Sequence, residues 1–448
     1  MRPNLLVFFT DQQRWDTCGC YGNPMGLTPH LDEMANRGVR FTHSFTVQPV
    51  CGPARACLQT GSYATWNGCF RNGIPLPPGS PTIAKACGAA GWWTGYIGKW
   101  HLGVSDHRGQ EFDPEGRMPT GNRGGYKDLW LAADVLEFTS LPNRYRVYDG
   151  DGHEVTRPGY RVDAQTDLVL ETFDALSRRR DRPFLLFVSY LEPHMQNHND
   201  EFAAPKGWAK ELAKDLWVPP DLAKLGADIN RYLPGYYGCV KSLDANLGRV
   251  LGLLRKTGLD NNTVVLFCSD HGNHFRTRND EYKRSCHEAS IRVPTVMQGP
   301  GFDGRGKVDG LVDLLDWHAT LMDAAGLTPL PGQQGRPLQK LLEGKAAGWN
   351  DVFVQVSESQ VGRAIRTRRW KYGVTAPAAD GEKDPAADEY EDQYLYDLEH
   401  DPHELENLSG DAAHSAVRDE LAELLKQRMV TAGEKPPIIR PGGTTGGR

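Results

Sequence analysis

The chain has 448 residues, of which 39% are hydrophobic and 24% charged, so it can bury a sizeable core and is not wholly disordered. Its formal net charge of −6 excludes nucleic-acid binding driven by overall basicity, so a polyanionic partner would need a local cationic pocket. This length predicts two or three domains, or one large α/β domain with a smaller partner.

Strand and helix patterns alternate along the first two thirds of the chain. The predicted strands are continuous apolar runs bounded by polar residues or glycine, as in buried parallel sheets. In chain order we expect a strand at 4–9, helices at 28–38 and 81–90, a strand at 92–97, a helix at 163–179, a strand at 184–191, a helix at 239–256 and a strand at 263–268. This alternation predicts an α/β fold with a large mixed, mostly parallel sheet sandwiched by helices. Polar segments at 105–160 and 195–235 are expected to be loops that shape a site.

Beyond residue 345 the pattern predicts a smaller C-terminal α+β subdomain, with an antiparallel sheet and one helix. The expected elements are strands at 351–356, 362–367, 369–374 and 393–398, an acidic loop at 376–392 and an amphipathic helix at 412–432. We therefore divide the chain into a large domain (1–345), a subdomain (346–435) and a flexible, Pro/Gly/Thr-rich tail (436–448).

Nine cysteines, an odd number with no C-x-x-C pair, argue against a disulfide framework or a zinc ribbon. No apolar run approaches the roughly 18 residues that span a bilayer, so no membrane association is expected. The apolar run at 5–9 is too short for a signal-peptide core and lacks a small-residue cleavage site. The sequence as given predicts a cytoplasmic protein, or a periplasmic or secreted one if a leader has been trimmed from it.

Polar side chains follow each of the four predicted strands. Because ligands bind at the carboxyl ends of strands in open α/β sheets, these side chains are expected on one rim. One group is rich in oxygen and suits a hard divalent cation such as Ca²⁺ or Mg²⁺: Asp11, Gln12, Asp270 and His271. The other group is cationic and suits an anion: Lys99, His101 and His194. Each residue alone is as well explained by a helix cap or a structural histidine, but four strand ends together favour a site.

A second feature is the segment from Cys51 to Gly61. Pro53 fits the first turn of a helix and Gly61 fits its C-terminal stop, so Cys51 is expected just before a helix N-terminus. The helix dipole and free N–H groups there favour anions and lower the pKa of a thiol, and Arg55 adds positive charge. The alternatives are a reactive or modified cysteine beside an anion site, and a buried, inert one.

Together, the ordered motifs resemble the type I sulfatase family of the alkaline-phosphatase superfamily, and the resemblance covers nearly the whole chain. The motifs are C-x-P-x-R at 51–55, G-K-W-H-L-G at 98–103, P-H at 193–194, S-D-x-G at 269–272 and, in the C-terminal region, R-W-K-Y at 369–372.

The resemblance implies that a maturation enzyme converts Cys51 to Cα-formylglycine. It implies a metal, Ca²⁺ by family expectation with Mg²⁺ or Mn²⁺ as alternatives, bound by Asp11, Gln12, the modified Cys51, Asp270 and His271. The small sulfated substrate is expected to be a saccharide. The oligomeric state stays open.

The resemblance also implies roles in catalysis. The hydrated aldehyde attacks sulfur with help from Asp270, and His101 later removes the second hydroxyl proton. The diol would be steadied by Arg55, Lys99 and His101. His194, with His198 as its competitor, is the expected general acid. Lys283, with Arg284 and His287 as competitors, is expected to hold a sulfate oxygen.

Further basic residues are candidates for substrate binding. The run His274, Arg276 and Arg278, together with Arg284 and His287, could read a second anionic group or sugar hydroxyls, or form a solvated loop face. Arg363 and Arg366 could project from the C-terminal subdomain towards the pocket.

Two positions depart from the family pattern. Gln12 stands where a second Asp is common, and His271 stands where an Asn is common. These departures keep a phosphonate monoester or phosphodiester hydrolase of the same superfamily open as an alternative to a sulfatase. A third reading is a non-catalytic glycan-binding protein on the same scaffold, which would lack one of the chemical groups.

Overall fold

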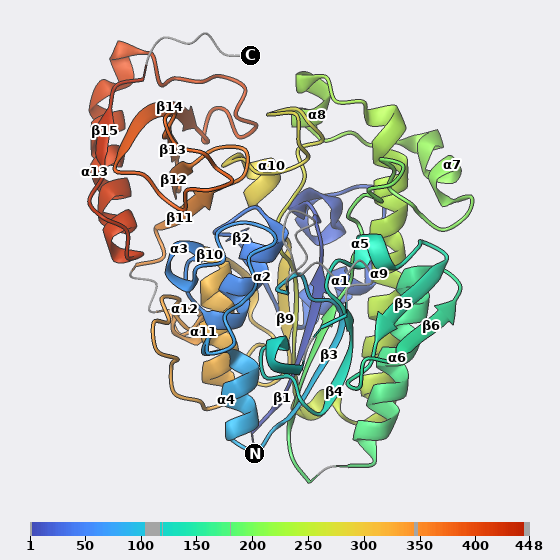
Figure 1. The fold of residues 1–448 in the computed structure, drawn as a ribbon. Coiled ribbons are helices and arrows are strands. Elements are labelled where there is room, and N and C mark those ends of the chain that lie inside the picture. Colours follow the sequence, from blue (N-terminus) through green and yellow to red (C-terminus); the bar gives the residue numbers. More distant parts are fainter. Residues whose placement is uncertain (1, 104–116, 119, 180, 345–347, 443–448) are drawn as a thin grey trace.

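A computed structural model describes residues 2–103, 117–118, 120–179, 181–344 and 348–442 (Figure 1). Its larger sheet has ten strands in the order β10-β2-β9-β8-β1-β7-β3-β4-β5-β6. The strands are β1 (Asn4–Thr10), β2 (Val39–Phe45), β3 (Trp93–Lys99), β4 (Leu129–Ala133), β5 (Arg144–Tyr148), β6 (Glu154–Pro158), β7 (Phe184–Ser189), β8 (Thr263–Ser269), β9 (Thr295–Gln298) and β10 (Gly306–Asp313).

The four strands expected from the sequence lie side by side at the centre of this sheet as β8, β1, β7 and β3. All three pairs are parallel, and their carboxyl ends are level: Thr10 pairs with Ser269, and Phe9 and Gly98 both pair with Ser189. Gly98 has φ 111°, and a Cβ there would lie 1.9 Å from the Ser189 carbonyl oxygen, so only glycine allows this approach. The predicted parallel core of the sheet is confirmed.

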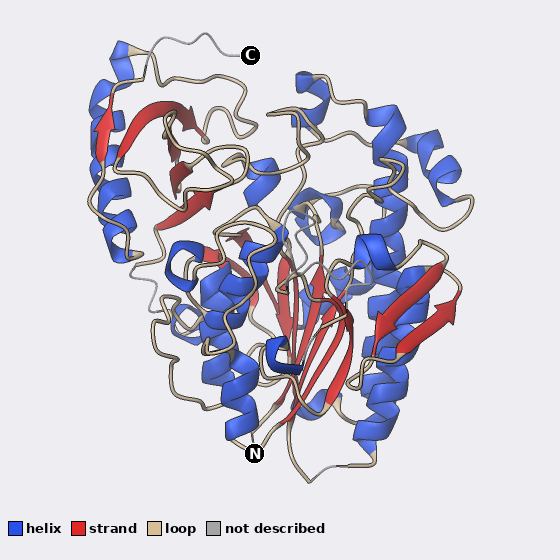
Figure 2. Ribbon diagram, viewed as in Figure 1, coloured by secondary structure: helices blue, strands red, loops and turns tan. Residues whose placement is uncertain are grey.

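Helices cover both faces of the large sheet (Figure 2). Leu5 of β1 packs into the core on one face and Leu6 into the core on the other, which explains the continuous apolar run. One face is covered by α2 (Cys51–Thr60), α4 (Ile83–Ala89) and α11 (Leu314–Ala324). The other is covered by α1 (Pro29–Arg37), α6 (Arg161–Ser177) and α9 (Ile229–Thr257). Shorter helices are α3 (Ala64–Asn67), α5 (Leu136–Thr139), α7 (Trp208–Leu212), α8 (Pro220–Leu225), α10 (Glu288–Ile291) and α12 (Gln339–Leu342).

Two segments predicted as loops contain regular structure. The segment 105–160 holds β4, α5, β5 and β6, although residues 104–116 lie outside the described part of the chain. The β5–β6 hairpin lies at the sheet edge, where polar outer side chains hid its pattern. The segment 195–235 holds α7, α8 and the start of α9, which begins ten residues before the expected 239 and continues through Pro234.

The C-terminal region forms a second sheet in the order β11-β12-β13-β14-β15, backed by α13 (Ser415–Thr431). Its strands are β11 (Asp351–Val356), β12 (Gly362–Thr367), β13 (Trp370–Thr375), β14 (Glu389–Asp397) and β15 (Ile438–Arg440). The α+β prediction is confirmed, with two corrections. The strand expected at 393–398 begins at Glu389, and the tail expected to be frayed supplies β15, which pairs parallel with β14.

All nine cysteines are free thiols, consistent with the absence of a disulfide framework. Within the described residues, the helices are too short or too polar to cross a bilayer.

A buried carboxylate at the junction of β10 and α11 gives the fold a testable pH dependence. Asp313 caps α11 by accepting hydrogen bonds from the backbone N–H groups of Leu315 (2.9 Å) and Asp316 (3.2 Å). Burial, reinforced by the neighbouring Asp316 carboxylate, raises the pKa of Asp313 to about 7 from its ordinary 3.8. The folded chain therefore keeps a proton that the unfolded chain has released.

We expect the free energy of unfolding to fall as the pH rises from about 4 to about 7, by up to about 1.4 kcal/mol per pH unit from this group. The stabilising contribution is complete below the unfolded pKa and is lost as the pH rises through the folded one. Asp313→Asn keeps the capping oxygen and should flatten this slope. Urea unfolding of both proteins at pH 5 and pH 8 measures it, and an equal change in the two would contradict the assignment.

Candidate active site

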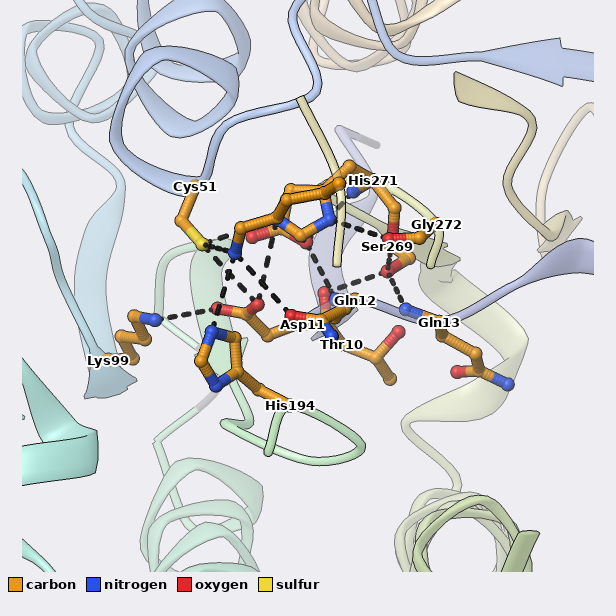
Figure 3. A network of polar contacts seen from close by, with 12 residues as sticks. Thr10, Asp11, Gln12, Gln13, Cys51, Lys99, His194, Ser269, His271 and Gly272 are labelled. Carbon is orange, nitrogen blue, oxygen red and sulfur yellow. Dashed lines mark hydrogen bonds and ion pairs between the residues drawn. The ribbon is translucent and has the colours of Figure 1, made fainter. Parts of the chain in front are cut away.

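The level carboxyl ends of the central strands bring the predicted rim residues together (Figure 3). Asp11 follows β1, His271 follows β8, and Lys99 ends β3. The Cys51 Sγ lies 3.5 Å from the Asp11 Oδ1, 3.2 Å from the His271 Nε2 and 2.8 Å from the Lys283 Nζ. All of these side chains are buried. The strand ends and the start of one helix therefore place their side chains together in one buried site.

The α2 helix begins at Cys51 itself. Cys51 is therefore the first residue of the helix, whereas the sequence predicted it just before the helix. The helix is buried along its whole length and ends at Gly61, whose φ of 71° is the left-handed conformation of a C-cap. The N–H of Gly52 donates to the Asn72 Oδ1 at 2.9 Å. The Cys51 side chain lies at this N-terminal end, which is the positive end of the helix dipole.

Two buried cations lie beneath Cys51 and neutralise the carboxylates. The Arg55 guanidinium is 2.9 Å from Asp11 and 3.3 Å from Asp270, and it also donates to the Ser189 Oγ at 2.6 Å. The Lys99 Nζ lies 2.8 Å from the Asp11 Oδ2 and 3.1 Å from Glu137 of α5. No motif in the sequence indicated a role for Glu137, because Glu137 and its partner Lys99 are distant in the sequence and meet only in the folded chain.

These charges control the ionisation of the thiol. Burial alone would raise the pKa of Cys51, but Lys283, Lys99 and His271 outweigh it and hold the pKa well below its ordinary value. Burial and the nearby Asp11 carboxylate raise the pKa of Asp270 to about 6. The site therefore favours an anion at position 51.

The donor set fits one divalent cation. The potential ligand atoms of Asp11, Cys51, Asp270 and His271 all lie within 4.8 Å of one another. Opposite ligands of a Ca²⁺ ion, at 2.3–2.6 Å each, are separated by about 5 Å, so the cluster matches a single ion. The Gln12 Nε2 is buried without a hydrogen-bond partner, and its Oε1 is 3.5 Å from the Lys283 Nζ.

A cavity of 470 Å³ opens above Cys51. The predicted site residues that line it are Gln12, Cys51, His101, His194, Lys283 and Arg284. The His194 Nε2 is 3.3 Å from the Lys283 Nζ, and its Nδ1 is 2.7 Å from the Met195 carbonyl oxygen. Residues that the sequence did not suggest also line the cavity: Asn72, Gly73, Val135, Glu137, Phe138, Met195, Asn197, Glu281, Tyr282, Glu358 and Glu382.

Comparisons with known proteins show which family the chain belongs to. Residues 3–327 match the family model described as Sulfatase, and residues 280–431 match one described as N-sulphoglucosamine sulphohydrolase, C-terminal. The first match covers most of the chain. This chain belongs to the sulfatase family.

Individual relatives extend the likeness over the full length of this sulfatase. An ulvan-active sulfatase of Formosa agariphila is 29% identical over 97% of this chain and 82% of its own. A putative sulfatase of Bacteroides fragilis shares the fold with a TM-score of 0.82, 24% identity and coverage of 97% and 96%. A phosphonate monoester hydrolase of Agrobacterium radiobacter shares it with a TM-score of 0.67, 24% identity and coverage of 96% of each chain. The protein is accordingly a sulfuric ester hydrolase.

Several residues predicted to bind substrate in this sulfatase lie away from the cavity. Arg276 pairs with Asp200 at 3.1 Å, and Arg278 donates to the His403 carbonyl oxygen at 2.8 Å. His274 and His287 are buried and contact the Lys283 carbonyl oxygen (3.0 Å) and the Tyr396 hydroxyl (3.1 Å). Of the five predicted substrate-binding residues, only Arg284 lines the cavity. The other four could not be distinguished from it beforehand, since the local sequence does not show which way the side chains of this loop point.

The competing candidates are also placed elsewhere. Arg363 pairs with Glu434 at 2.9 Å and Arg366 with Glu288 at 3.3 Å, both inside or beside the C-terminal sheet rather than in the cavity. His198 packs edge-on against Phe138 and does not line the cavity, whereas His194 does.

We expect the sulfatase to bind one divalent cation, and Asp270→Asn to weaken that binding by about tenfold or more. Asparagine keeps the size and the Oδ1, which accepts hydrogen bonds from the Gln12 and His271 N–H groups, but it removes the charge. Calorimetric titration of chelator-stripped protein with Ca²⁺ measures the affinity. Asp149→Asn, in the exposed Asp149–Asp151–His153 group, is the matched control. Equal effects of the two substitutions would contradict the assignment.

Proposed function

We propose that this sulfatase hydrolyses a sulfate monoester of a carbohydrate, with a Cα-formylglycine made from Cys51 and a divalent cation beside it. The observation that carries the proposal is the position of the Cys51 side chain. It lies at a helix N-terminus on the cavity floor, within 3.5 Å of Asp11, His271 and Lys283. The carbohydrate is supported by the C-terminal family model, whose description names an amino sugar, and by the ulvan-active relative.

The formylglycine, once hydrated, would supply an oxygen nucleophile that a thiol lacks, and the cation would stabilise negative charge. Asp11, Gln12, Asp270 and His271 are the residues proposed to hold the cation, with Ca²⁺ favoured and Mg²⁺ or Mn²⁺ as alternatives. Arg55 and Lys99 would keep the Asp11 carboxylate ionised from beneath.

The remaining roles follow from which side chains reach the cavity. Lys283 would hold a sulfate oxygen, since its Nζ lies 2.8 Å from the Cys51 Sγ. His194, whose Nε2 is 3.3 Å from that Nζ, would protonate the leaving oxygen of the sugar. His101, which also lines the cavity, would accept the proton released at position 51 when sulfate departs. The net reaction converts one ester and one water into an alcohol and sulfate.

Two measurements on protein from a host with the maturation enzyme test the proposal. The peptide containing position 51 should be about 18 Da lighter than its cysteine form, as conversion of a thiol to an aldehyde requires. Its kcat/KM should be higher on an aryl sulfate than on an aryl phosphodiester. An unmodified Cys51 in such a host would contradict the cofactor.

A phosphodiester or phosphonate monoester is the second candidate substrate. It is supported by Gln12, which stands where a second Asp is common and would supply an uncharged ligand beside Asp11, and by the shared fold with the Agrobacterium enzyme. A strong preference for the aryl phosphodiester would establish it in place of the sulfatase reaction.

A further inference from the structure

The cavity above Cys51 changes character between its floor and its mouth. The floor is cationic, with Lys283 only 5% exposed beside Cys51. Its wall also carries three carboxylates, Glu281, Glu358 and Glu382, and one guanidinium, Arg284. Glu281 has a side chain that is 52% exposed, so this acidic surface meets the solvent.

The one guanidinium at the mouth is already occupied. The Arg284 Nε donates to the Glu358 Oε2 at 2.7 Å, and the Arg284 Nη1 donates to the Glu281 Oε2. The Glu358 Oε1 in turn accepts the backbone N–H of Asn72 at 2.7 Å. This network holds the guanidinium against carboxylates, so an incoming anion would have to compete with two of them.

Other basic side chains in the neighbourhood are directed away from the cavity. Arg276 is paired with Asp200 and Arg278 with backbone carbonyl groups. Among the described residues that line the cavity, Lys283 and Arg284 are therefore the only lysine or arginine. Lys283 is assigned to the sulfate that is cleaved, so no lysine or arginine among these described lining residues is left unpaired for a second anionic group.

Another part of the wall is apolar. Phe138 is 47% exposed, although large hydrophobic side chains are mostly buried in this chain, and Val135 and Met195 also line the cavity. An exposed ring next to carboxylates and amides such as Asn72 and Asn197 offers a surface for the C–H face of a sugar ring, with acceptors for its hydroxyl or amino groups.

We propose that this cavity selects a monosulfated sugar whose other substituents near the cleaved sulfate are uncharged or cationic, such as an amino sugar with a free amine. A second sulfate or a carboxylate there would lose water and be repelled by the net negative charge of three carboxylates and one guanidinium, whereas an ammonium group would be attracted by it. This selectivity rests on the proposed sulfate hydrolysis.

The test uses three glucosamine sulfates with the cleaved sulfate at the same position and the nitrogen free, acetylated or sulfated. We expect kcat/KM to fall in that order, by about tenfold or more between the first and the last. In the double variant Glu281→Gln/Glu382→Gln, the ratio of kcat/KM for the free amine to kcat/KM for the N-sulfated sugar should shrink by about threefold for each charge removed. Glu211→Gln, which removes the same charge from α7 outside the cavity, should leave the ratio unchanged.

Binding of the three desulfated products to Cys51→Ala, measured by calorimetry, gives a second readout without turnover. The same order of affinity is expected. An equal or reversed order in turnover, or a ratio that the control alters as much as the double variant, would overturn the selectivity. Absence of turnover on every sulfate ester by formylglycine-containing protein would instead overturn the proposed function.

Discussion

Alanine at position 51 should reduce turnover of an aryl sulfate by at least about 10⁴-fold, because it removes the side chain that is proposed to become the nucleophile. The loss should appear in kcat. Stability should change little, since the thiol is small and its neighbours keep their own partners. Steady-state kinetics and urea unfolding of Cys51→Ala measure the two effects.

Cys57→Ala provides the matched control on the same helix. Cys57 is also buried, but it belongs to the hydrophobic core beneath α2 and does not line the cavity. Burial raises the pKa of its thiol, so it stays protonated, in contrast to Cys51. Turnover by Cys57→Ala should remain within a few-fold of the parent. Comparable losses in the two variants would contradict a specific role for Cys51.

Replacing Lys99 by methionine should both stop catalysis and destabilise the protein by about 3–5 kcal/mol. The Lys99 Nζ is fully buried between Asp11 and Glu137, so its removal leaves Glu137 buried without a counter-charge and Asp11 with Arg55 alone. Adding Glu137→Gln removes one of these charges and should recover part of the stability, but not the turnover. Chemical unfolding of the two single variants and the double variant measures this coupling.

Lys371→Met is the control that separates the loss of stability from the loss of turnover. The Lys371 ammonium is equally buried and contacts two carboxylates, Glu288 and Glu404, but it lies in the C-terminal sheet outside the cavity. A similar loss of stability is expected, with turnover of the folded fraction preserved. Retained turnover in Lys99→Met would contradict the role of Lys99 in holding Asp11 ionised.

The central strands and the main site residues were predictable because their signals are local. A buried parallel strand needs a continuous apolar run, and the residue after it must be polar where the chain turns into the site. Asp11, Lys99 and Asp270 each stand directly at such a strand end. The α2 helix was readable for a similar reason, since Pro53 and Gly61 satisfy local backbone requirements at its two ends.

The cavity wall was not predictable in the same way. Glu137 and Phe138 reach the site from α5, a short helix in a segment whose composition indicated only a loop. The basic run around Arg276 and Arg278 has the composition of an anion-binding loop, yet its side chains find partners in Asp200 and in backbone carbonyl groups far along the chain. Such partners depend on contacts between distant segments, which no local pattern records.

The site explains two features of the composition. One of the nine cysteines, Cys51, lies in the site, and the net charge of −6 is an average over a cationic cavity floor and an acidic wall. Sequence by itself determined the chemistry available at the floor: one cysteine at a helix start, carboxylates for a cation, and cations for an anion. Only the tertiary structure decided the charge of the cavity wall, where Glu281, Glu358 and Glu382 share the lining with a single arginine, Arg284, that is already paired. Bond-forming groups are placed by strand ends and helix caps, whereas the charge that a substrate meets on entry is set by how separate loops pack against one another.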